Sequence, residues 1–201
     1  MSEPDATQLP GGRAAALELL HEYTQKPGLI GHALAVEAAV RAYARRAGAD
    51  EEAWGLVGLM HDFDYERWPS TDDHPFRGVE ILRERGYPEW FCRAILSHAD
   101  YSGVPRESDL EKTLFACDEL SGFLTACALV TPTRSLHDVK VRSVKKKLKS
   151  KGFAASVNRS DIHEGAAELG LELDEHITFV LAALCEVADE LGLGGEGAQE
   201  S

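Results

Sequence analysis

The sequence predicts an all-α fold, and three observations favour it. Apolar residues recur at spacings of three and four over most of the 201 residues, which is the spacing of one helix face. No segment shows a sustained two-residue alternation of apolar and polar residues. No pair of hairpin turn residues separates two apolar runs, and the chain shows no internal repeat. We therefore expect a single helical domain of ordinary size.

Five helices are expected in the first part of the chain. Residues 1–10 are polar and end in a proline, so we expect them to be disordered. Pro27 and Gly28 should end the first helix, and Gly86 is a suitable C-terminal stop for the fourth. The expected ranges are about 12–25, 29–46, 50–60, 73–85 and 88–98.

Four more helices are expected in the second part, over about 110–130, 139–151, 160–169 and 174–191. The segment 139–151 is strongly basic, with seven Lys and Arg residues and no Asp or Glu. A lysine-rich helix of this kind is ordinarily a solvated face, and the alternative is that a few of its lysines bind phosphate. The tail 193–201 is rich in glycine and polar, so we expect it to be disordered.

Composition excludes several classes of protein. The net charge of −13 argues against a general nucleic-acid binder, because polymeric phosphate is held by a surplus of Lys and Arg. The four cysteines stand singly, which fits thiols in a reducing cytosol rather than a disulfide framework. The first ten residues lack the pattern of a signal peptide, and no apolar run has transmembrane length. We expect a cytoplasmic protein without membrane contact.

A set of histidines and aspartates is the strongest functional signal. Imidazole and carboxylate are ligand types that transition metals accept. One histidine on an apolar helix face is more often an ordinary core residue, but an aspartate on such a stripe costs several kcal/mol without a partner. A bound cation would offset that cost. The candidate metal ligands are His32, His61, Asp62, His74, His98 and Asp118.

This ordered set resembles the HD domain superfamily of metal-dependent phosphohydrolases, in particular its six-ligand, HDIG-type members. Three local phrases also resemble the family: GLMHDFDYE, HPFRGVEILRERGYPEW and AILSHAD. The resemblance implies an all-α HD-domain helical bundle with its core at about 29–130 and a helical extension at 131–192, within a single domain at 11–192. It also implies that one metal is held by His32, His61, Asp62 and Asp118, and a second by His74, His98 and the shared Asp62.

The function that the resemblance implies is hydrolysis of a phosphomonoester or phosphodiester bond by a metal-activated hydroxide, with His61 and Asp62 as catalytic residues. The expected substrate is a small phosphorylated molecule, with a nucleotide favoured. One or two divalent transition-metal ions are expected. Manganese or iron is favoured, and magnesium, zinc, nickel and cobalt are possible. Two alternatives stay open: a non-catalytic sensor that binds metal or nucleotide in an HD fold, and an interaction protein whose histidines belong to the core.

The run HDFDYE departs from the HDIG pattern, in which a small residue and a lysine commonly follow the HD pair. A replacement cation could come from an arginine or from the basic segment 139–151. Asp64 and Glu66 could instead accept hydrogen bonds from ligand histidines. The candidate substrate-binding residues are Asp64, Arg67, Arg77, Arg134, Lys140 and Lys145. We expect the protein to be a monomer or a homodimer.

Overall fold

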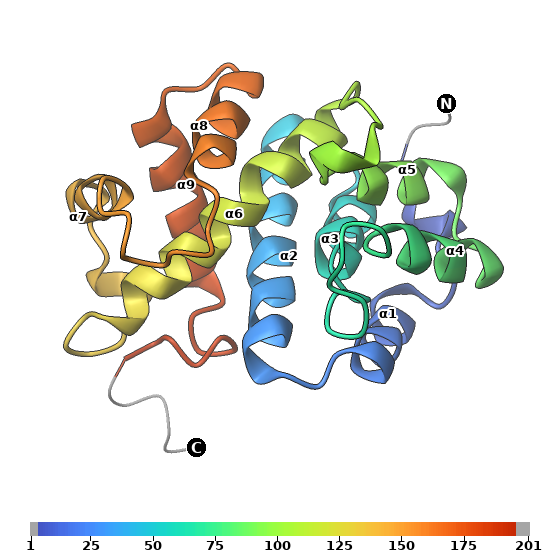
Figure 1. Cartoon of the computed structure of the whole chain (residues 1–201), viewed down its shortest axis with the longest axis horizontal. Helices are drawn as coiled ribbons and strands as arrows, with labels where there is room; N and C mark the ends of the chain where they lie inside the picture. The colour runs from blue at the N-terminus through green and yellow to red at the C-terminus, as the bar shows by residue number, and fades with distance from the viewer. Residues whose placement is uncertain (1–3, 196–201) are drawn as a thin grey trace. The chain divides into compact units, whose positions relative to one another are not determined.

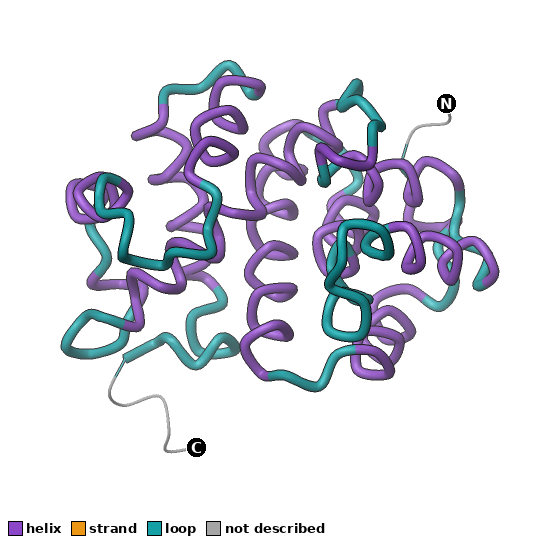
Figure 2. Tube along the Cα trace, in the orientation of Figure 1, coloured by secondary structure: helices purple, strands orange, loops and turns teal. Residues whose placement is uncertain are grey.

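The computed structural model describes residues 4–195, and these residues form α-helices and short 3-10 helices joined by loops, with no β-strand (Figures 1 and 2). The all-α prediction is therefore confirmed. The α-helices are α1 (Gly12–Tyr23), α2 (Pro27–Ala47), α3 (Glu51–Met60), α4 (Phe76–Glu84), α5 (Glu89–Ser97), α6 (Asp109–Leu129), α7 (Val141–Leu148), α8 (Arg159–Glu168) and α9 (Leu173–Glu186). The 3-10 helices are η1 (Ala6–Gln8), η2 (Asp100–Ser102) and η3 (Leu136–Asp138).

The chain divides into two compact units, Met1–Phe115 and Ala116–Ser201. The division falls inside α6, so that helix contributes its first part to one unit and its second part to the other. The expected extent of a single domain, 11–192, stays a prediction.

In the first unit, α2 and α3 approach closely because two glycines of α3 face α2. A Cβ atom at Gly58 would lie 3.0 Å from the carbonyl oxygen of Val36, and one at Gly55 would lie 2.5 Å from the side chain of Arg41. Arg41 itself forms ion pairs with the buried Glu37, at 2.9 Å, and with Glu52, at 2.7 Å. The two helices therefore hold a fixed spacing, which matters because α3 leads into the HD pair.

The ends of these helices follow local chemistry. Asp50 caps α3 by accepting a hydrogen bond from the backbone N–H of Ala53 at 3.0 Å. Gly86 follows α4 with φ +84°, a left-handed conformation that glycine adopts without strain, so the predicted stop is confirmed. The prediction for Pro27 was wrong in detail. Pro27 begins α2 instead of ending α1, because the first helical position needs no N–H donor.

Residues 4–10 make specific contacts, although disorder was predicted for residues 1–10. Asp5 caps η1, the backbone N–H of Ala6 donates to Asp50 at 2.8 Å, and Leu9 is buried. Trp90 also donates its indole N–H to Gln8 at 3.0 Å. These contacts join distant parts of the chain, which is why local composition did not indicate them. The remaining positions, 1–3, lie outside the described residues.

In the second unit, α9 packs against α8, α7 and η3. A Cβ atom at Gly165 of α8 would lie 2.5 Å from the Cα atom of Ala116, so α8 is in close contact with α6 at Ala116. His176 of α9 is buried and donates through Nε2 to the carbonyl oxygen of Ala116 at 2.9 Å. Helices α7 and α9 are both shorter than expected. Leu193, inside the predicted disordered tail, is buried, and 196–201 lie outside the described residues.

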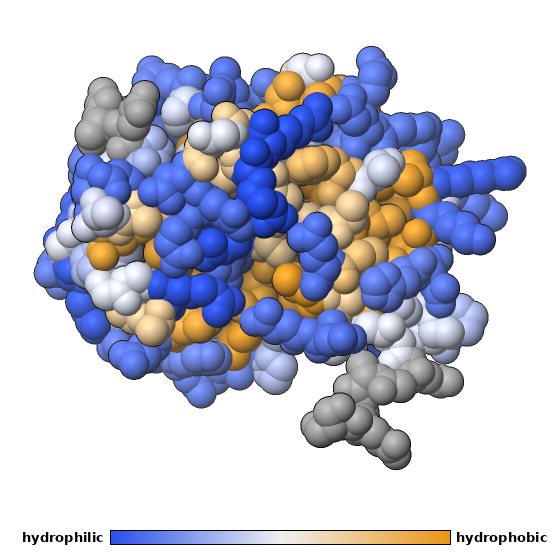
Figure 3. Space-filling view, turned by 180° about the vertical axis from the view of Figure 1, so that it is seen from behind, coloured by the Kyte–Doolittle hydropathy of each residue, from blue (hydrophilic) through white to orange (hydrophobic). Residues whose placement is uncertain are grey.

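On the face drawn in Figure 3, an area of hydrophobic residues is visible between hydrophilic ones. Among residues 4–195, no helix combines the length and the apolar character needed to cross a membrane. Three of the four cysteines are buried, and burial raises the pKa of the Cys92 and Cys127 thiols to about 11. The three buried cysteines, Cys92, Cys117 and Cys127, are free thiols packed in the interior. The large hydrophobic side chains exposed in the described part are Tyr65, Tyr101, Leu129 and Val130.

Candidate metal centre

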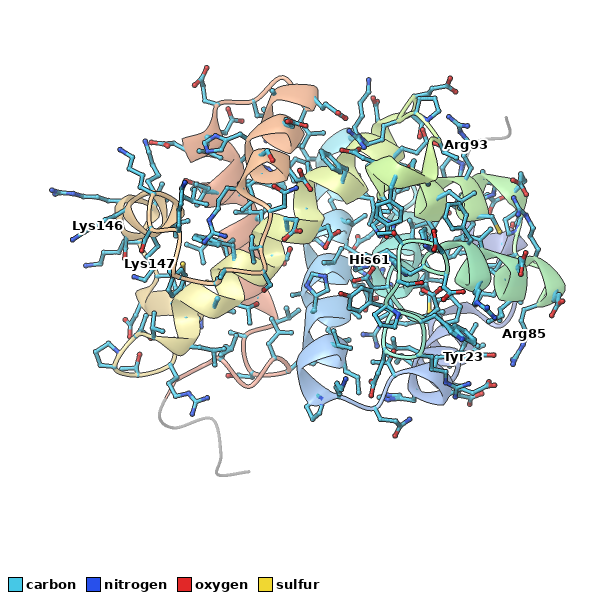
Figure 4. All side chains as sticks on the ribbon, viewed as in Figure 1. Tyr23, His61, Arg85, Arg93, Lys146 and Lys147 are labelled. Atoms are coloured by element: carbon cyan, nitrogen blue, oxygen red, sulfur yellow. The ribbon has the colours of Figure 1, made fainter. Side chains whose placement is uncertain are left out.

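The HD pair stands at the C-terminal end of α3 (Figure 4). Every residue of α3 from Ala53 to Met60 is buried, so the helix carries His61 into the interior, where its side chain has no exposed surface. The Nδ1 atom of His61 donates to the carbonyl oxygen of Gly58 at 2.8 Å. Asp62 follows with a side chain that is 22 % exposed. The pair therefore offers ligand atoms at the edge of the core.

One cluster joins His32, His61 and Asp62, whose ligand atoms all lie within 4.8 Å of one another. The Nε2 atoms of the two histidines are 3.3 Å apart. The Oδ2 atom of Asp62 lies 3.5 Å from Nε2 of His61 and 4.0 Å from Nε2 of His32. His32 belongs to α2, so the close packing of α2 on α3 brings this cluster together.

A second cluster joins Asp62, His74 and His98 within the same distance limit. The other oxygen of Asp62, Oδ1, lies 3.2 Å from Nε2 of His74 and 3.4 Å from Nε2 of His98. His74 precedes α4 and His98 follows α5, and their ring centroids are 5.3 Å apart. Asp62 therefore faces one cluster with each of its oxygens.

The hydrogen bonds on the far side of the rings decide which atoms face Asp62. His61 and His98 each donate through Nδ1 to a backbone carbonyl oxygen, of Gly58 and Ile95, and a carbonyl can only accept. Nδ1 therefore carries a hydrogen in both rings, and in the neutral form Nε2 carries a lone pair. Lone pairs of imidazole and carboxylate thus converge on the same small volume, an arrangement that needs protons or a cation. The donor set fits a divalent transition metal.

The pKa shifts of Asp62 and His74 arise from these same contacts between imidazole and carboxylate groups. Burial disfavours the charged form of Asp62, but the charge of His61 and hydrogen bonds from His74 and His98 outweigh it and hold the pKa of Asp62 well below 3.8. Burial likewise disfavours protonated His74, but hydrogen bonds to Asp62 and Asp64 outweigh it and raise the pKa of His74 to about 9. Without a cation, protons hold this site together.

The loop after the HD pair is fixed to the turn between α1 and α2. The buried hydroxyl of Thr24 donates to the carbonyl oxygen of Phe63 at 2.8 Å. Glu66 accepts from the backbone N–H groups of Gln25 at 2.7 Å and Lys26 at 2.9 Å, at the start of α2. Glu66 therefore binds backbone N–H groups just before α2 rather than a ligand histidine, which corrects one of the alternatives left open by the sequence.

Three predicted substrate contacts in this unit have other partners. Asp64 is 1 % exposed, and its two oxygens accept from His74 and Gly78, so it supports a histidine instead of facing a substrate. Arg67 lies over the ring of Tyr23 at 4.1 Å and donates to the carbonyl oxygen of Glu22. Arg77 pairs with Asp73 and lies over the ring of Trp68 at 5.4 Å. Neither arginine belongs to the two clusters.

The other candidates belong to the second unit, and their roles at this site stay predictions. Asp118 lies in the second part of α6 and is partly buried. Arg134 is exposed in a turn, and Lys140 and Lys145 are exposed at α7. Lys145 pairs with Asp174 at 2.7 Å. Lys146 of α7 projects away from its helix in Figure 4. An open groove of about 560 Å³ is lined by Val141, Arg142, Lys145, Lys146, Lys149 and Asp174.

Two residues near the clusters were missed at the level of sequence. Gly78 lies against the carboxylate of Asp64, and its place in the phrase HPFRGVEILRERGYPEW was the available signal. Tyr65 contacts His74 edge to face with ring centroids 5.2 Å apart and is 39 % exposed. Tyr65 stands where HDIG-type members commonly carry a lysine, but nothing in the sequence indicated its contact with His74.

Comparison with known proteins bears on these residues. Residues 29–122 match the family model described as HD domain, a stretch that contains all six candidate ligands. No curated protein and no solved structure matches the chain. The match does not separate the HDIG type from other HD domains, so that finer resemblance stays a prediction. Over residues 29–122 the chain is therefore similar to the HD domain family.

Proposed function

We propose that this chain is a metal-dependent phosphohydrolase that cleaves a phosphomonoester or phosphodiester bond of a small phosphorylated molecule, with a nucleotide as the favoured substrate. One observation carries the proposal: the Nε2 atoms of His61, His74 and His98 all lie 3.2 to 3.5 Å from the carboxylate of Asp62. The HD match supports it, because HD domains are commonly metal-dependent hydrolases.

Two ions fit the arrangement of the ligand atoms. His32, His61 and Oδ2 of Asp62 would hold one, with Asp118 as a further proposed ligand. His74, His98 and Oδ1 of Asp62 would hold the other. When bound, such ions supply positive charge and Lewis acidity toward a phosphoryl group. The favoured metals are manganese and iron, since imidazole-rich sets suit them better than magnesium.

The chain itself orients these ligands. The carbonyl oxygens of Gly58 and Ile95 keep a hydrogen on Nδ1 of His61 and His98, which leaves Nε2 available. The buried position of α3 excludes water from the inner side of His61. Asp62, at the edge of the core, is the residue that can face both the interior ligands and an incoming substrate, so His61 and Asp62 are the proposed catalytic residues.

The test combines elemental analysis of protein purified without added metal with phosphate release from a panel of nucleotides and simple phosphoesters. We expect one or two transition-metal ions per chain and turnover of at least one substrate. Asp62→Ala should lose both metal and turnover, because Asp62 belongs to both clusters. Asp174→Ala, which removes an exposed carboxylate paired with Lys145, is the matched control and should keep both.

The outcomes separate this proposal from its alternatives. Metal without turnover of any substrate would favour a sensor that binds metal or nucleotide without hydrolysis. Absence of metal even after reconstitution with manganese, iron and cobalt would overturn the proposed function, since the histidines would then be core residues.

A further inference from the structure

We infer that Asp64 is a positioning residue for the second cluster: its carboxylate fixes the tautomer and orientation of His74, and Gly78 must be glycine because that carboxylate occupies the space where a Cβ atom would lie. The inference rests on the proposed function, since it concerns a ligand of the proposed metal centre.

Asp64 is a buried carboxylate with two specific partners. Its side chain is 1 % exposed, and burying a carboxylate is costly unless its oxygens are bonded. Oδ1 accepts from Nδ1 of His74 at 2.8 Å, and Oδ2 accepts from the backbone N–H of Gly78 at 2.8 Å. Gly78 lies in the first turn of α4, where backbone N–H groups lack a partner within the helix. Asp64 therefore joins the histidine to the start of the helix that follows it.

His74 needs this partner because of where it stands. His61 and His98 each end a helix, and each finds an acceptor in the carbonyl oxygen three residues earlier. His74 comes before α4, and its Nδ1 atom bonds the carboxylate of Asp64 instead of a backbone carbonyl oxygen. A side chain from another segment therefore supplies the acceptor. Asp64, ten residues earlier, supplies it by accepting from Nδ1 of His74. As in His61 and His98, Nε2 is then the ring nitrogen that faces Asp62, here at 3.2 Å.

The space around Gly78 gives independent support. A Cβ atom there would lie 2.7 Å from Cγ of Asp64 and 2.8 Å from its Oδ2, which is closer than real Cβ contacts allow. The carboxylate cannot move away without losing both of its hydrogen bonds. The φ angle of Gly78 is not in the left-handed region, and the helix itself would accept alanine at this position. The contact with Asp64, and not the backbone conformation, therefore requires glycine.

An asparagine at position 64 would test the direction of these hydrogen bonds while keeping the size of the side chain. Its single oxygen can stay on the N–H of Gly78, and its NH₂ group then faces Nδ1 of His74. Nδ1 must then accept, so the hydrogen of the neutral ring is favoured on Nε2, which weakens metal binding at that atom. The first cluster, His32, His61 and Asp62, keeps all of its own contacts.

The experiment titrates the metal-free full chain with Co²⁺ alone, followed by calorimetry and visible absorption, for wild type, Asp64→Asn and Gly78→Ala. We expect two Co²⁺ ions in wild type and a loss of about 10- to 100-fold in affinity for one of them in each variant, while the other ion still binds. Asp73→Asn is the matched control, because Asp73 is in the same loop and pairs with Ser70 and Arg77 instead of a histidine. Circular dichroism checks that each variant is folded, and Gly78→Ala keeps the test open if Asp64→Asn does not fold.

Two results would overturn the inference. One is that both variants, though folded, bind two Co²⁺ ions as wild type does. The other is that wild type binds only one ion, because the second cluster is then not a metal site. Failure of the proposed function is recognised separately, since wild type would then bind no Co²⁺ before any variant is considered.

Discussion

The Nε2 atoms of His32 and His61 face each other at 3.3 Å, and their rings meet nearly edge to face with centroids 5.1 Å apart. Because Nδ1 of His61 donates to Gly58, its Nε2 presents a lone pair in the neutral form. Either a proton or a metal ion must lie between the two rings. This contact joins α2 to α3 and distinguishes the first cluster from the second, which contains neither His32 nor His61.

The two clusters should therefore lose metal separately. His32→Ala should remove the ion of the first cluster and keep the second, and His98→Ala should do the reverse. We expect each loss to exceed the roughly 10- to 100-fold effect of changes around a ligand, because a ligand itself is removed. Elemental analysis after dialysis measures the ions kept per chain. Retention of both ions by either variant would contradict the division into two clusters.

Metal binding to the second cluster should release a proton. Burial disfavours protonated His74, but hydrogen bonds to Asp62 and Asp64 raise its pKa to about 9, so the ring is protonated at pH 7 in the metal-free chain. A metal ligand has to be neutral, so the ion displaces that proton, and its affinity should rise with pH up to about 9. Calorimetry at pH 7 in two buffers of different ionisation enthalpy should show about one proton released per ion. His74→Ala should abolish the release of this proton. Equal heats of binding in both buffers for wild type would contradict the prediction.

Buried His176 should make the second unit less stable in acid. Burial lowers its pKa below 6.5, and the hydrogen bond to the carbonyl oxygen of Ala116 only partly offsets this. Below pH 6.5 the unfolded chain therefore takes up a proton that the folded chain does not. The stabilising contribution is present above 6.5 and falls as the pH drops, by at most about 1.4 kcal/mol per pH unit.

Denaturant unfolding of wild type and His176→Gln between pH 5 and pH 7.5 would measure this contribution, with His163→Gln as the control because His163 is exposed on α8. His176→Gln should have a smaller dependence on pH than wild type. The same pH dependence in all three proteins would show that His176 does not titrate on unfolding in this range.

Gly58→Ala should destabilise the first unit. The added Cβ would lie 3.0 Å from Val36 O and 3.1 Å from Glu37 Cα, both backbone atoms, so α2 and α3 would have to separate. We expect a cost of about 1 to 3 kcal/mol, as for overpacking elsewhere. Gly31→Ala in α2 is the matched control, because nothing lies within 4 Å of its Cβ position, and it should stabilise the helix by up to about 1 kcal/mol. Equal effects of the two changes in thermal unfolding would contradict this account.

Much of the fold was predictable because helical periodicity is a local property. The expected helix at 29–46 corresponds to α2, and the one at 110–130 corresponds to α6, with ends that differ by one or two residues. The helix ends were less predictable. The sequence could not show that Pro27 begins α2, because proline suits a first helical position as well as a loop.

The candidate ligands were predictable, but their surroundings were not. Five of the six, His32, His61, Asp62, His74 and His98, come together in the structure, while Asp118 stays a prediction. The supporting contacts depend on tertiary structure: Arg67 rests on Tyr23, which is more than 40 residues away in sequence, and nothing local indicates that pairing. Asp64 was a substrate candidate and also a possible acceptor for a histidine, and only its burial and its two bonds favour the second role.

The position of Asp62 has one more consequence. Because Oδ2 faces His32 and His61 while Oδ1 faces His74 and His98, both clusters draw on the negative charge of one carboxylate. A cation held by one oxygen reduces the charge that the other oxygen offers, so occupancy of either cluster weakens the other. Linkage requires the two effects to be equal. The site would then respond to metal concentration over a broader range than two independent ions would allow.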